Sequence, residues 1–260
     1  MSNRVRVEQH DGVATVTIDR PEAANSLDLN TARALLNAVA EVAEDRGARC
    51  LLIRSNGDKF CVGGDVREFT KGGEPTDRHI AELAGTMHRV ILAVARIEKP
   101  VVCLVQGATA GAGVGLAMAA DIVIASRAAH FTAAYSAIGL TPDCGMTWFL
   151  PRLIGRRRAA EMILTNRRIG AEEAVAIGLI TRISEQLEEE GRSVARSLAR
   201  GATGALGSIR SLLHYSCEAG LERQLELELA AIRAASVSAE GQEGIAAFVD
   251  RRGPDFERIR

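Results

Sequence analysis

The chain has 260 residues, of which 47% are hydrophobic and 25% are charged, as is typical of a globular protein. The formal net charge of −1 argues against a large sequence-independent nucleic-acid surface. No apolar run reaches the ~20 residues that span a membrane. Five scattered cysteines without a C-x-x-C pair predict a reducing, cytoplasmic location.

The first two thirds of the chain alternate strand and helix patterns. Around Asp11-Gly12, apolar and polar residues alternate on both sides, which predicts a β-hairpin. Apolar residues at helical spacing and short apolar runs then follow one another. The predicted elements are strands over 5–7 and 13–19, a helix over 31–44, a strand over 50–54, a helix over about 80–96, a strand over 101–105, a helix over 112–120 and a strand over 121–125.

After Gly170 the pattern becomes almost entirely helical. The predicted helices cover 171–177, about 187–200, 203–217, 220–236 and 239–251. We therefore expect residues 1–200 to form an α/β core and residues 201–260 to form a separate helical segment. The apolar face around Leu225 and Leu229 is too extensive for a lone helical hairpin to bury. This face must pack on the core or on another copy of the chain.

A glycine-rich turn follows the apolar strand 101–105. Gly111 and Gly113 open directly into an alanine-rich helix, so backbone N–H groups can point at one spot, where negative charge is stabilised. A dinucleotide fingerprint is excluded, because the gap to Gly115 is one residue too short and 124–132 contains no acid. The turn is either a site for an oxyanion or a plain structural junction.

Further motifs make the pattern specific. They are Asp19–Leu27, Asn56-Gly-Asp-Lys-Phe-Cys-Val-Gly-Gly-Asp65, Ile138–Gly155, Ala171–Ile180 and Glu243–Phe248. In this order and spacing, they resemble the crotonase (enoyl-CoA hydratase/isomerase) superfamily over nearly the whole chain. The Pro-Asp-x-Gly run at 142–145 resembles the phenylacetate-pathway type of enoyl-CoA isomerase in particular. The resemblance implies a spiral of repeated ββα units and assembly into trimers or hexamers.

The resemblance also implies an acyl-CoA substrate whose thioester carbonyl becomes an enolate oxyanion. Its motif register assigns the two backbone donors of the oxyanion hole to Gly64 and Ala112. Coenzyme A enters as part of the substrate, and no separate cofactor is expected. The coenzyme A contacts assigned by the register are Glu22, Ala23, Ala24, Val62, Gly63, Asp65 and Val66, with Arg20 and Arg67 as candidate phosphate partners.

The acid/base residue decides the reaction. The hydratases of the superfamily use two glutamates, but Gly115 and Tyr135 occupy those positions here. Hydration needs one group to activate water and another to handle the α-proton, so hydratase activity is not expected. Asp143 matches the catalytic carboxylate of the isomerases, and one carboxylate suffices to move a proton from C2 to C4. The alternative for Asp143 is a cap on the helix that starts near Gly145.

Three other functions stay open. Tyr135 is a candidate for the working polar group of a decarboxylase or a hydratase-like enzyme, or else a wall of the substrate pocket. A non-catalytic acyl-CoA-binding protein would also lack the two glutamates.

The five histidines show no metal-binding spacing, so no metal is expected, and His79 and His88 are interpreted as solvated helix residues.

Overall fold

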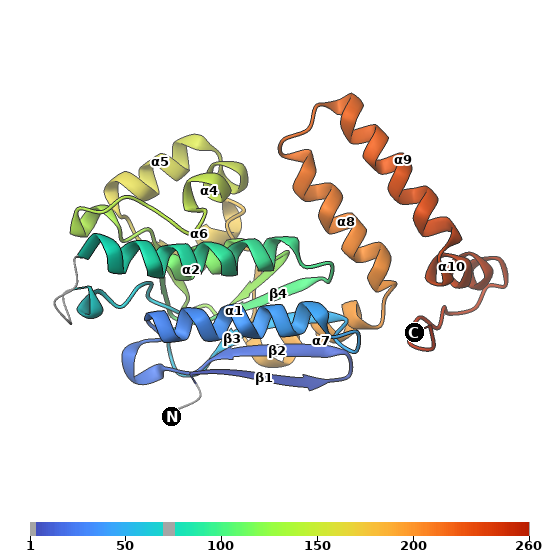
Figure 1. Cartoon of the computed structure of the whole chain (residues 1–260), viewed down its shortest axis with the longest axis horizontal. Coiled ribbons are helices and arrows are strands. Elements are labelled where there is room, and N and C mark those ends of the chain that lie inside the picture. The colour runs from blue at the N-terminus through green and yellow to red at the C-terminus, as the bar shows by residue number, and fades with distance from the viewer. Residues whose placement is uncertain (1–3, 70–75, 260) are drawn as a thin grey trace.

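The computed structural model of the chain describes residues 4–69 and 76–259, which contain two sheets and their covering helices (Figure 1). The larger sheet has the strand order β1-β2-β3-β4-β6-β9. Its strands are β1 (Val5–His10), β2 (Val13–Ile18), β3 (Cys50–Ser55), β4 (Val101–Val105), β6 (Ile122–Ala125) and β9 (Arg182–Ile183). β1 and β2 form the predicted antiparallel hairpin, and all other neighbours are parallel. Parallel pairing requires a crossover between strands.

A second layer of short strands is built from these crossovers. It contains β5 (Ala108–Ala110), β7 (His130–Thr132) and β8 (Ile169–Gly170). Two isolated parallel bridges, Leu27 with Gly64 and Cys61 with Thr109, extend this layer toward earlier turns of the chain. The chain therefore winds as a spiral of stacked strand–strand–helix turns, which confirms the predicted α/β architecture.

Helices cover both faces of the central part of the larger sheet, because β3 and β4 are buried on both sides, whereas the edge strand β1 is largely exposed. In β3, Leu51 and Ile53 belong to the core beneath α1 (Leu29–Glu44) and α2 (Thr76–Arg96). The alternate residues of β3 pack with α7 (Leu187–Ala199). Gly191 lets α7 pack equally closely on the neighbouring strand β4, since a Cβ there would lie 2.4 Å from the Leu104 side chain.

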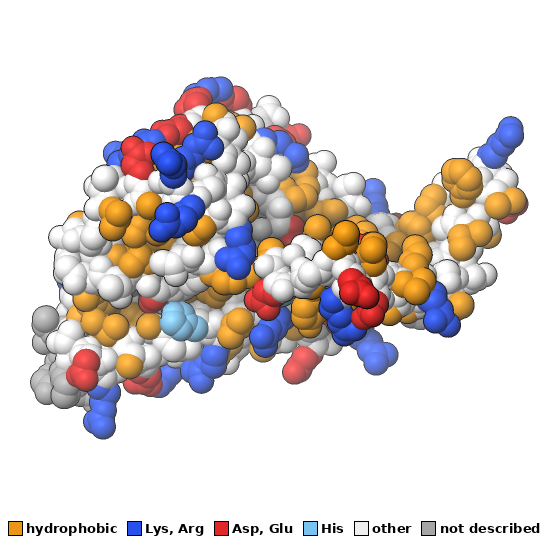
Figure 2. All heavy atoms as spheres, turned by 90° about the horizontal axis from the view of Figure 1, so that it is seen from above, with side chains coloured by type: hydrophobic (Ala, Val, Ile, Leu, Met, Phe, Trp, Pro, Cys, Tyr) orange, Lys and Arg blue, Asp and Glu red, His pale blue; other side chains and the backbone are white. Residues whose placement is uncertain are grey.

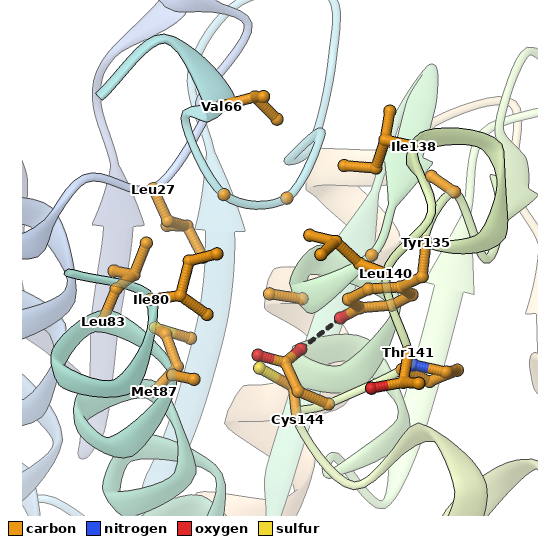
Figure 3. A pocket seen from close by; sticks show the side chains of 18 of the residues that line it. Leu27, Val66, Ile80, Leu83, Met87, Tyr135, Ile138, Leu140, Thr141 and Cys144 are labelled. Atoms are coloured by element: carbon orange, nitrogen blue, oxygen red, sulfur yellow. Dashed lines mark hydrogen bonds between the residues drawn. The ribbon is translucent and has the colours of Figure 1, made fainter. Parts of the chain in front are cut away.

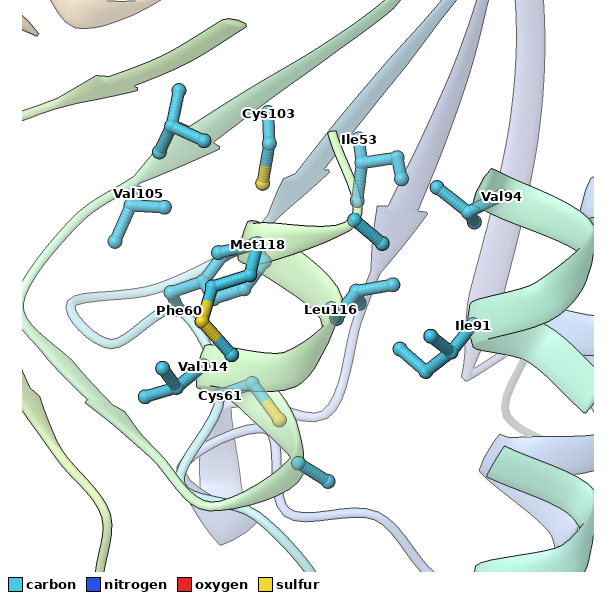
Figure 4. Packing of buried hydrophobic residues seen from close by; sticks show 14 of the residues in the cluster. Ile53, Phe60, Cys61, Ile91, Val94, Cys103, Val105, Val114, Leu116 and Met118 are labelled. Carbon is cyan, nitrogen blue, oxygen red and sulfur yellow. The ribbon is translucent and has the colours of Figure 1, made fainter. Parts of the chain in front are cut away.

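The helix that follows the glycine turn, α3 (Ala112–Met118), is wholly buried. Figure 4 shows Val114, Leu116 and Met118 of this helix packed among Phe60 and residues of β3 and β4. A Cβ on Gly113 would lie 2.3 Å from the carbonyl oxygen of Cys61. Only glycine allows this approach, and it brings the two glycine-rich turns together.

The stretch from β5 to α7 contains several elements that the sequence patterns did not predict. α4 (Met146–Ile154) begins close to the predicted position, whereas α5 (Arg156–Thr165), β5, β7, β8 and β9 were not predicted. α6 (Ala171–Ala176) agrees with the predicted helix over 171–177. The missed strands are two or three residues long, too short for a period-two pattern to identify.

The last three helices stand apart from the layered part of the molecule (Figure 1). They are α8 (Thr203–Ser216), α9 (Leu221–Val237) and α10 (Ala239–Val249). α8 is anchored by Arg210, whose guanidinium pairs with Asp121 at 2.6 Å. A Cβ on Gly207 would lie 2.4 Å from the Glu98 carbonyl, so α8 also packs closely on the core.

Exposed hydrophobic side chains gather on this projecting part of the molecule (Figure 2). They include Leu221, Leu225, Leu229, Ile232, Val237, Ile245, Phe248 and Val249. The intrachain packing considered in the sequence analysis therefore leaves much of these helices uncovered. Among the described residues, no helix is long and apolar enough to cross a membrane.

Candidate active site

A cavity of about 240 Å³ lies between α2 and the segment that follows β7 (Figure 3). Ile80, Leu83 and Met87 form one wall, because their spacing places them on the same face of α2. Tyr135 and the aliphatic side chains after it form the opposite wall. Both glycine-rich turns also line the cavity. Such an apolar chamber with few polar groups suits the acyl part of a ligand.

Two backbone N–H groups at the cavity have no acceptor among the described residues. In the first turn, the Gly63 carbonyl accepts from Leu27 N–H, and Asp65 N–H donates to the Leu27 carbonyl. Strand alternation then directs the intervening Gly64 N–H away from Leu27. Ala112 is the first residue of α3, so its N–H has no acceptor within the helix.

The two turns that carry these N–H groups are in contact. A Cβ on Gly63 would lie 3.6 Å from the Ala112 nitrogen and 3.1 Å from the carbonyl oxygen of Ala110. Glycine at 63, with φ of +90°, allows both the approach and the backbone conformation. The structure thus brings Gly64 and Ala112, both predicted donors, to one cavity, as an oxyanion hole requires.

Asp143 reaches the same cavity from the opposite wall. Its carboxylate accepts a hydrogen bond from the Tyr135 hydroxyl (Figure 3). Burial raises the pKa of Tyr135 above its usual range, and the Asp143 carboxylate raises it further. The phenol therefore stays protonated and acts as a donor. Tyr135 and Asp143 were both predicted to belong to the site, and the structure joins them directly.

The helix-cap alternative for Asp143 is wrong. The residue before α4 is Gly145, and no side chain caps that helix. Met146 N–H donates to the backbone carbonyl of Asp143 at 3.0 Å, while the carboxylate bonds to Tyr135. The carboxylate is therefore available to the cavity and has no structural task at the helix end.

The backbone beside Asp143 adopts an uncommon conformation. Cys144 has φ of +50° and Gly145 has φ of +73°. Cys144 N–H donates to Nε2 of His88 at 3.2 Å. The interpretation of His88 as a solvated helix residue was therefore incomplete, since its exposed ring contacts the loop that carries Asp143.

His88, Asp143 and Cys144 each offer a ligand-type atom, and these atoms lie within 4.8 Å of one another. No other trio of this kind occurs in residues 4–69 and 76–259. Burial raises the pKa of the Cys144 thiol, and the Asp143 carboxylate adds to the effect, so the sulfur is a neutral thiol. Nε2 of His88 already accepts the Cys144 N–H, and the Asp143 carboxylate already accepts the Tyr135 hydroxyl, so two groups of the trio are engaged within the protein.

Arg20, Asp65 and Arg67 form an ion-paired network beside the first turn. Asp65 is buried, and its carboxylate lies 2.9 Å from both guanidinium groups. Hydrogen bonds from Arg67 lower the pKa of Asp65, burial opposes them, and Arg20 adds to the lowering. Arg20 is itself buried and also contacts Ser26 and Asp28, so the expectation that it binds phosphate is wrong. Arg67 is exposed and accessible to an anion.

The remaining predicted coenzyme A contacts lie at two depths. Val62, Gly63 and Val66 line the cavity, whereas the 3₁₀ turn Pro21–Ala23 and the Ala24 that follows it lie outside, with Glu22 exposed and the two alanines half-buried. The Asp65 side chain is fully engaged by the two arginines. Its backbone is bonded as well, because its N–H donates to the Leu27 carbonyl and its carbonyl accepts from Glu68 N–H, so Asp65 holds the turn in place.

Asn25 is a structural residue of the site that sequence reasoning missed. Its side chain is buried and donates to the carbonyl oxygens of Asn56 and Lys59, at 2.8 and 2.7 Å. Its carbonyl oxygen accepts from Arg20 N–H. Asn25 thereby joins the 3₁₀ turn to the first glycine-rich turn, and an asparagine at a turn was its only sequence signal.

Comparisons with known proteins agree with this geometry. The family model described as enoyl-CoA hydratase/isomerase matches residues 8–259. The 1,2-epoxyphenylacetyl-CoA isomerase of Escherichia coli is 38% identical over 251 residues, covering 94% of this chain and 95% of that protein. The trans-2-decenoyl-[acyl-carrier-protein] isomerase of Streptococcus mutans is 32% identical, with 95% of each chain covered.

Solved structures share the fold over the same extent. The crystal structure of an enoyl-CoA hydratase from Polaromonas sp. JS666 superimposes with a TM-score of 0.91 at 30% identity, covering 96% of this chain and 98% of that one. The match spans the core and the C-terminal helices alike. Together with the family model, it shows that the chain is an enzyme of the enoyl-CoA hydratase/isomerase family, the crotonase superfamily.

Proposed function

We propose that this enzyme is an enoyl-CoA isomerase that shifts a double bond from the Δ3 to the Δ2 position, or carries out a related epoxide or ring isomerisation. One observation carries the proposal. Among the described residues that line the cavity, Asp143 is the one carboxylate, and the backbone N–H groups of Gly64 and Ala112 have no recorded acceptor. That set can make and reprotonate an enolate, and it contains no second carboxylate to activate water.

In this mechanism, the thioester oxygen accepts hydrogen bonds from Gly64 and Ala112. Asp143 removes a proton from C2 of a 3-enoyl thioester, and the electron pair of that C–H bond delocalises into a dienolate whose negative charge lies on the thioester oxygen. The protonated Asp143 then returns the proton to C4. The double bond moves to C2–C3 and the thioester carbonyl is restored. Each oxyanion donor contributes about 3 kcal/mol of transition-state stabilisation.

Tyr135 supports the base in this scheme. Its hydroxyl donates to Asp143 and holds the carboxylate in place in the cavity for proton abstraction. The raised pKa of Tyr135 keeps that donor protonated at neutral pH. The polar atom of Tyr135 is therefore engaged with Asp143, which favours a supporting role over the decarboxylase reading.

The acyl group would occupy the apolar cavity, with coenzyme A extending outward as part of the substrate. Val62, Gly63 and Val66 would contact the pantetheine arm beside the thioester. Glu22, Ala23 and Ala24, which lie outside the cavity, would contact coenzyme A farther out. The guanidinium of Arg67 is available for a phosphate. No cofactor besides the substrate's own coenzyme A is required by this chemistry.

We also propose that the chain assembles as a homotrimer or hexamer through residues 201–260. The exposed apolar side chains of α9 and α10 support this, since an uncovered face of that extent marks an interaction site. Phe248, 85% exposed, would then approach a neighbouring subunit. Phe256 packs near Gly244 of its own chain and is less available for the same role.

A panel of thioesters with product identification tests the proposal. The enzyme should convert 3-enoyl-CoA to 2-enoyl-CoA while hydrating crotonyl-CoA very slowly or not at all. Brisk hydration would favour the hydratase reading. Carbon dioxide release from a malonyl-type thioester would favour decarboxylation. Tight binding of all thioesters without any turnover would leave only the non-catalytic function.

A further inference from the structure

We infer that His88 is a positioning residue for Asp143: it accepts the Cys144 amide hydrogen bond and thereby fixes the loop on which the base sits. The inference deepens the proposed function and depends on it for its kinetic consequence. The observation behind it is the 3.2 Å contact from Cys144 nitrogen to His88 Nε2.

The hydrogen bond restrains a backbone that would otherwise relax. Cys144 is a non-glycine residue with φ of +50°, a conformation that L-residues avoid. Such strain persists only where surrounding contacts determine the conformation. No backbone acceptor for the Cys144 N–H occurs among the described residues, so the imidazole is the group that satisfies it.

The support comes from a rigid element. His88 follows Met87 on α2, and Met87 and Ile91 are both buried in the core. The ring therefore projects from a helix that cannot easily shift. Tyr135 holds the carboxylate end of Asp143, while His88 holds the backbone one residue later. The two contacts fix the base from both ends.

His88 acts through the loop because it does not line the substrate cavity. It lines a second cavity of about 360 Å³, between α2, α4 and α8, together with Trp148 and His214. His214 stacks near Trp148, with ring centroids 5.6 Å apart, and makes no contact with the Asp143 loop that the structure records. His214 is therefore a matched control for the loss of a histidine ring from the second cavity.

The kinetic test compares His88→Leu, which has no acceptor, with His88→Gln, whose amide oxygen can replace Nε2. Because a displacement of about 1 Å in a catalytic group can cost 10²-fold, kcat for 3-enoyl-CoA should fall about 10- to 100-fold in His88→Leu, with KM within about threefold. His88→Gln should recover most of kcat, and His214→Leu should match the unmodified enzyme. Equal kcat in the Leu, Gln and unmodified forms would overturn the inference.

Hydrogen exchange of the Cys144 amide gives a readout that does not need turnover. The amide should be protected in the unmodified enzyme and His88→Gln, and should exchange at least tenfold faster in His88→Leu. If no thioester is turned over, the proposed function fails, but this comparison still decides whether His88 holds the loop. Unchanged protection in His88→Leu contradicts the inference. If that variant does not fold, His88→Asn, whose side chain is too short to reach Cys144, takes its place.

Discussion

A Cβ on Gly115 would lie 2.6 Å from the carbonyl oxygen of Cys144, so α3 and the loop that carries Asp143 pack backbone against backbone. Gly113, two residues earlier on α3, makes the equivalent approach to Cys61 in the first glycine-rich turn. Through these two positions without side chains, α3 brings the first glycine-rich turn and the loop that carries Asp143 together. Any side chain at position 115 would collide with the backbone of Cys144, next to Asp143.

Gly115→Ala should destabilise the enzyme by about 1–3 kcal/mol, as overpacking of a filled core does, and should lower kcat by moving Asp143. Gly85→Ala is the matched control, because Gly85 is exposed on α2 with no atom within 4 Å of an added Cβ. That control should stabilise the protein by about 0.5–1 kcal/mol. Urea unfolding measures both; a Gly115→Ala protein as stable as the parent would refute the packing argument.

Tyr135→Phe separates a supporting role from a direct catalytic one. The change removes the hydroxyl that donates to Asp143 and retains the ring that lines the cavity. Without that hydrogen bond the carboxylate is less firmly placed, and because a displacement of about 1 Å in a catalytic group can cost 10²-fold, kcat should fall about tenfold. A loss as large as that in Asp143→Asn would instead make Tyr135 a full partner in the chemistry.

Much of the fold was predictable from the sequence because its long elements carry strong periodic patterns. The helix expected over 31–44 is α1, and the strand expected over 101–105 has those bounds in the structure. The strands of the small sheet could not be predicted in the same way. A strand of two or three residues is too short to show an alternating pattern of apolar and polar residues. Its pairing partner also lies far away in the sequence, as in the bridge between Cys61 and Thr109.

The site was predictable where backbone motifs carry it and unpredictable where tertiary packing does. Gly64, Ala112 and Asp143 lie together as the motif register implied. Arg20 was misassigned because a surface cation and a buried, paired one look alike in sequence. The contact of His88 with the Asp143 loop was missed because it depends on the positive φ of Cys144. No local pattern in the sequence predicts that backbone conformation.

The ion-paired network around Asp65 should make the free energy of unfolding decrease at acid pH. The pKa of Asp65 is lowered in the folded protein, so its ionised form contributes stability above the unfolded-state pKa of about 4 and loses that contribution as pH falls below it. Asp65→Asn leaves buried Arg20 undercompensated and should cost about 3 kcal/mol at pH 7. The gap between the two proteins should shrink below about pH 4.

Urea unfolding at several pH values measures this gap. Glu172→Gln, which breaks an exposed ion pair with Arg127, is the control and should leave the unfolding midpoint nearly unchanged. A constant gap between the parent and Asp65→Asn from neutral to strongly acid pH would show that Asp65 is not the titrating group.

The C-terminal helices should determine assembly. Replacing Leu229 and Ile232, which are 59% and 65% exposed on α9, with Asp should convert the predicted trimer or hexamer to monomer. The charges cannot be desolvated at an apolar contact. Leu164→Asp, at an exposed position on α5, should leave the mass unchanged. Sedimentation gives the masses, and a parent protein that is monomeric at micromolar concentration is the contrary result.

Isotope exchange with Asp143→Asn tests whether the Asp143 carboxylate moves the proton. The change keeps the size of the side chain and removes the base, so thioester binding should persist while isomerisation falls by about 10²–10⁴. In deuterated water the unmodified enzyme should place label at C2 or C4 of the acyl group, and the variant should not. Retained binding with lost exchange is the predicted result. Label incorporation at the parent rate by a folded Asp143→Asn protein would contradict the account.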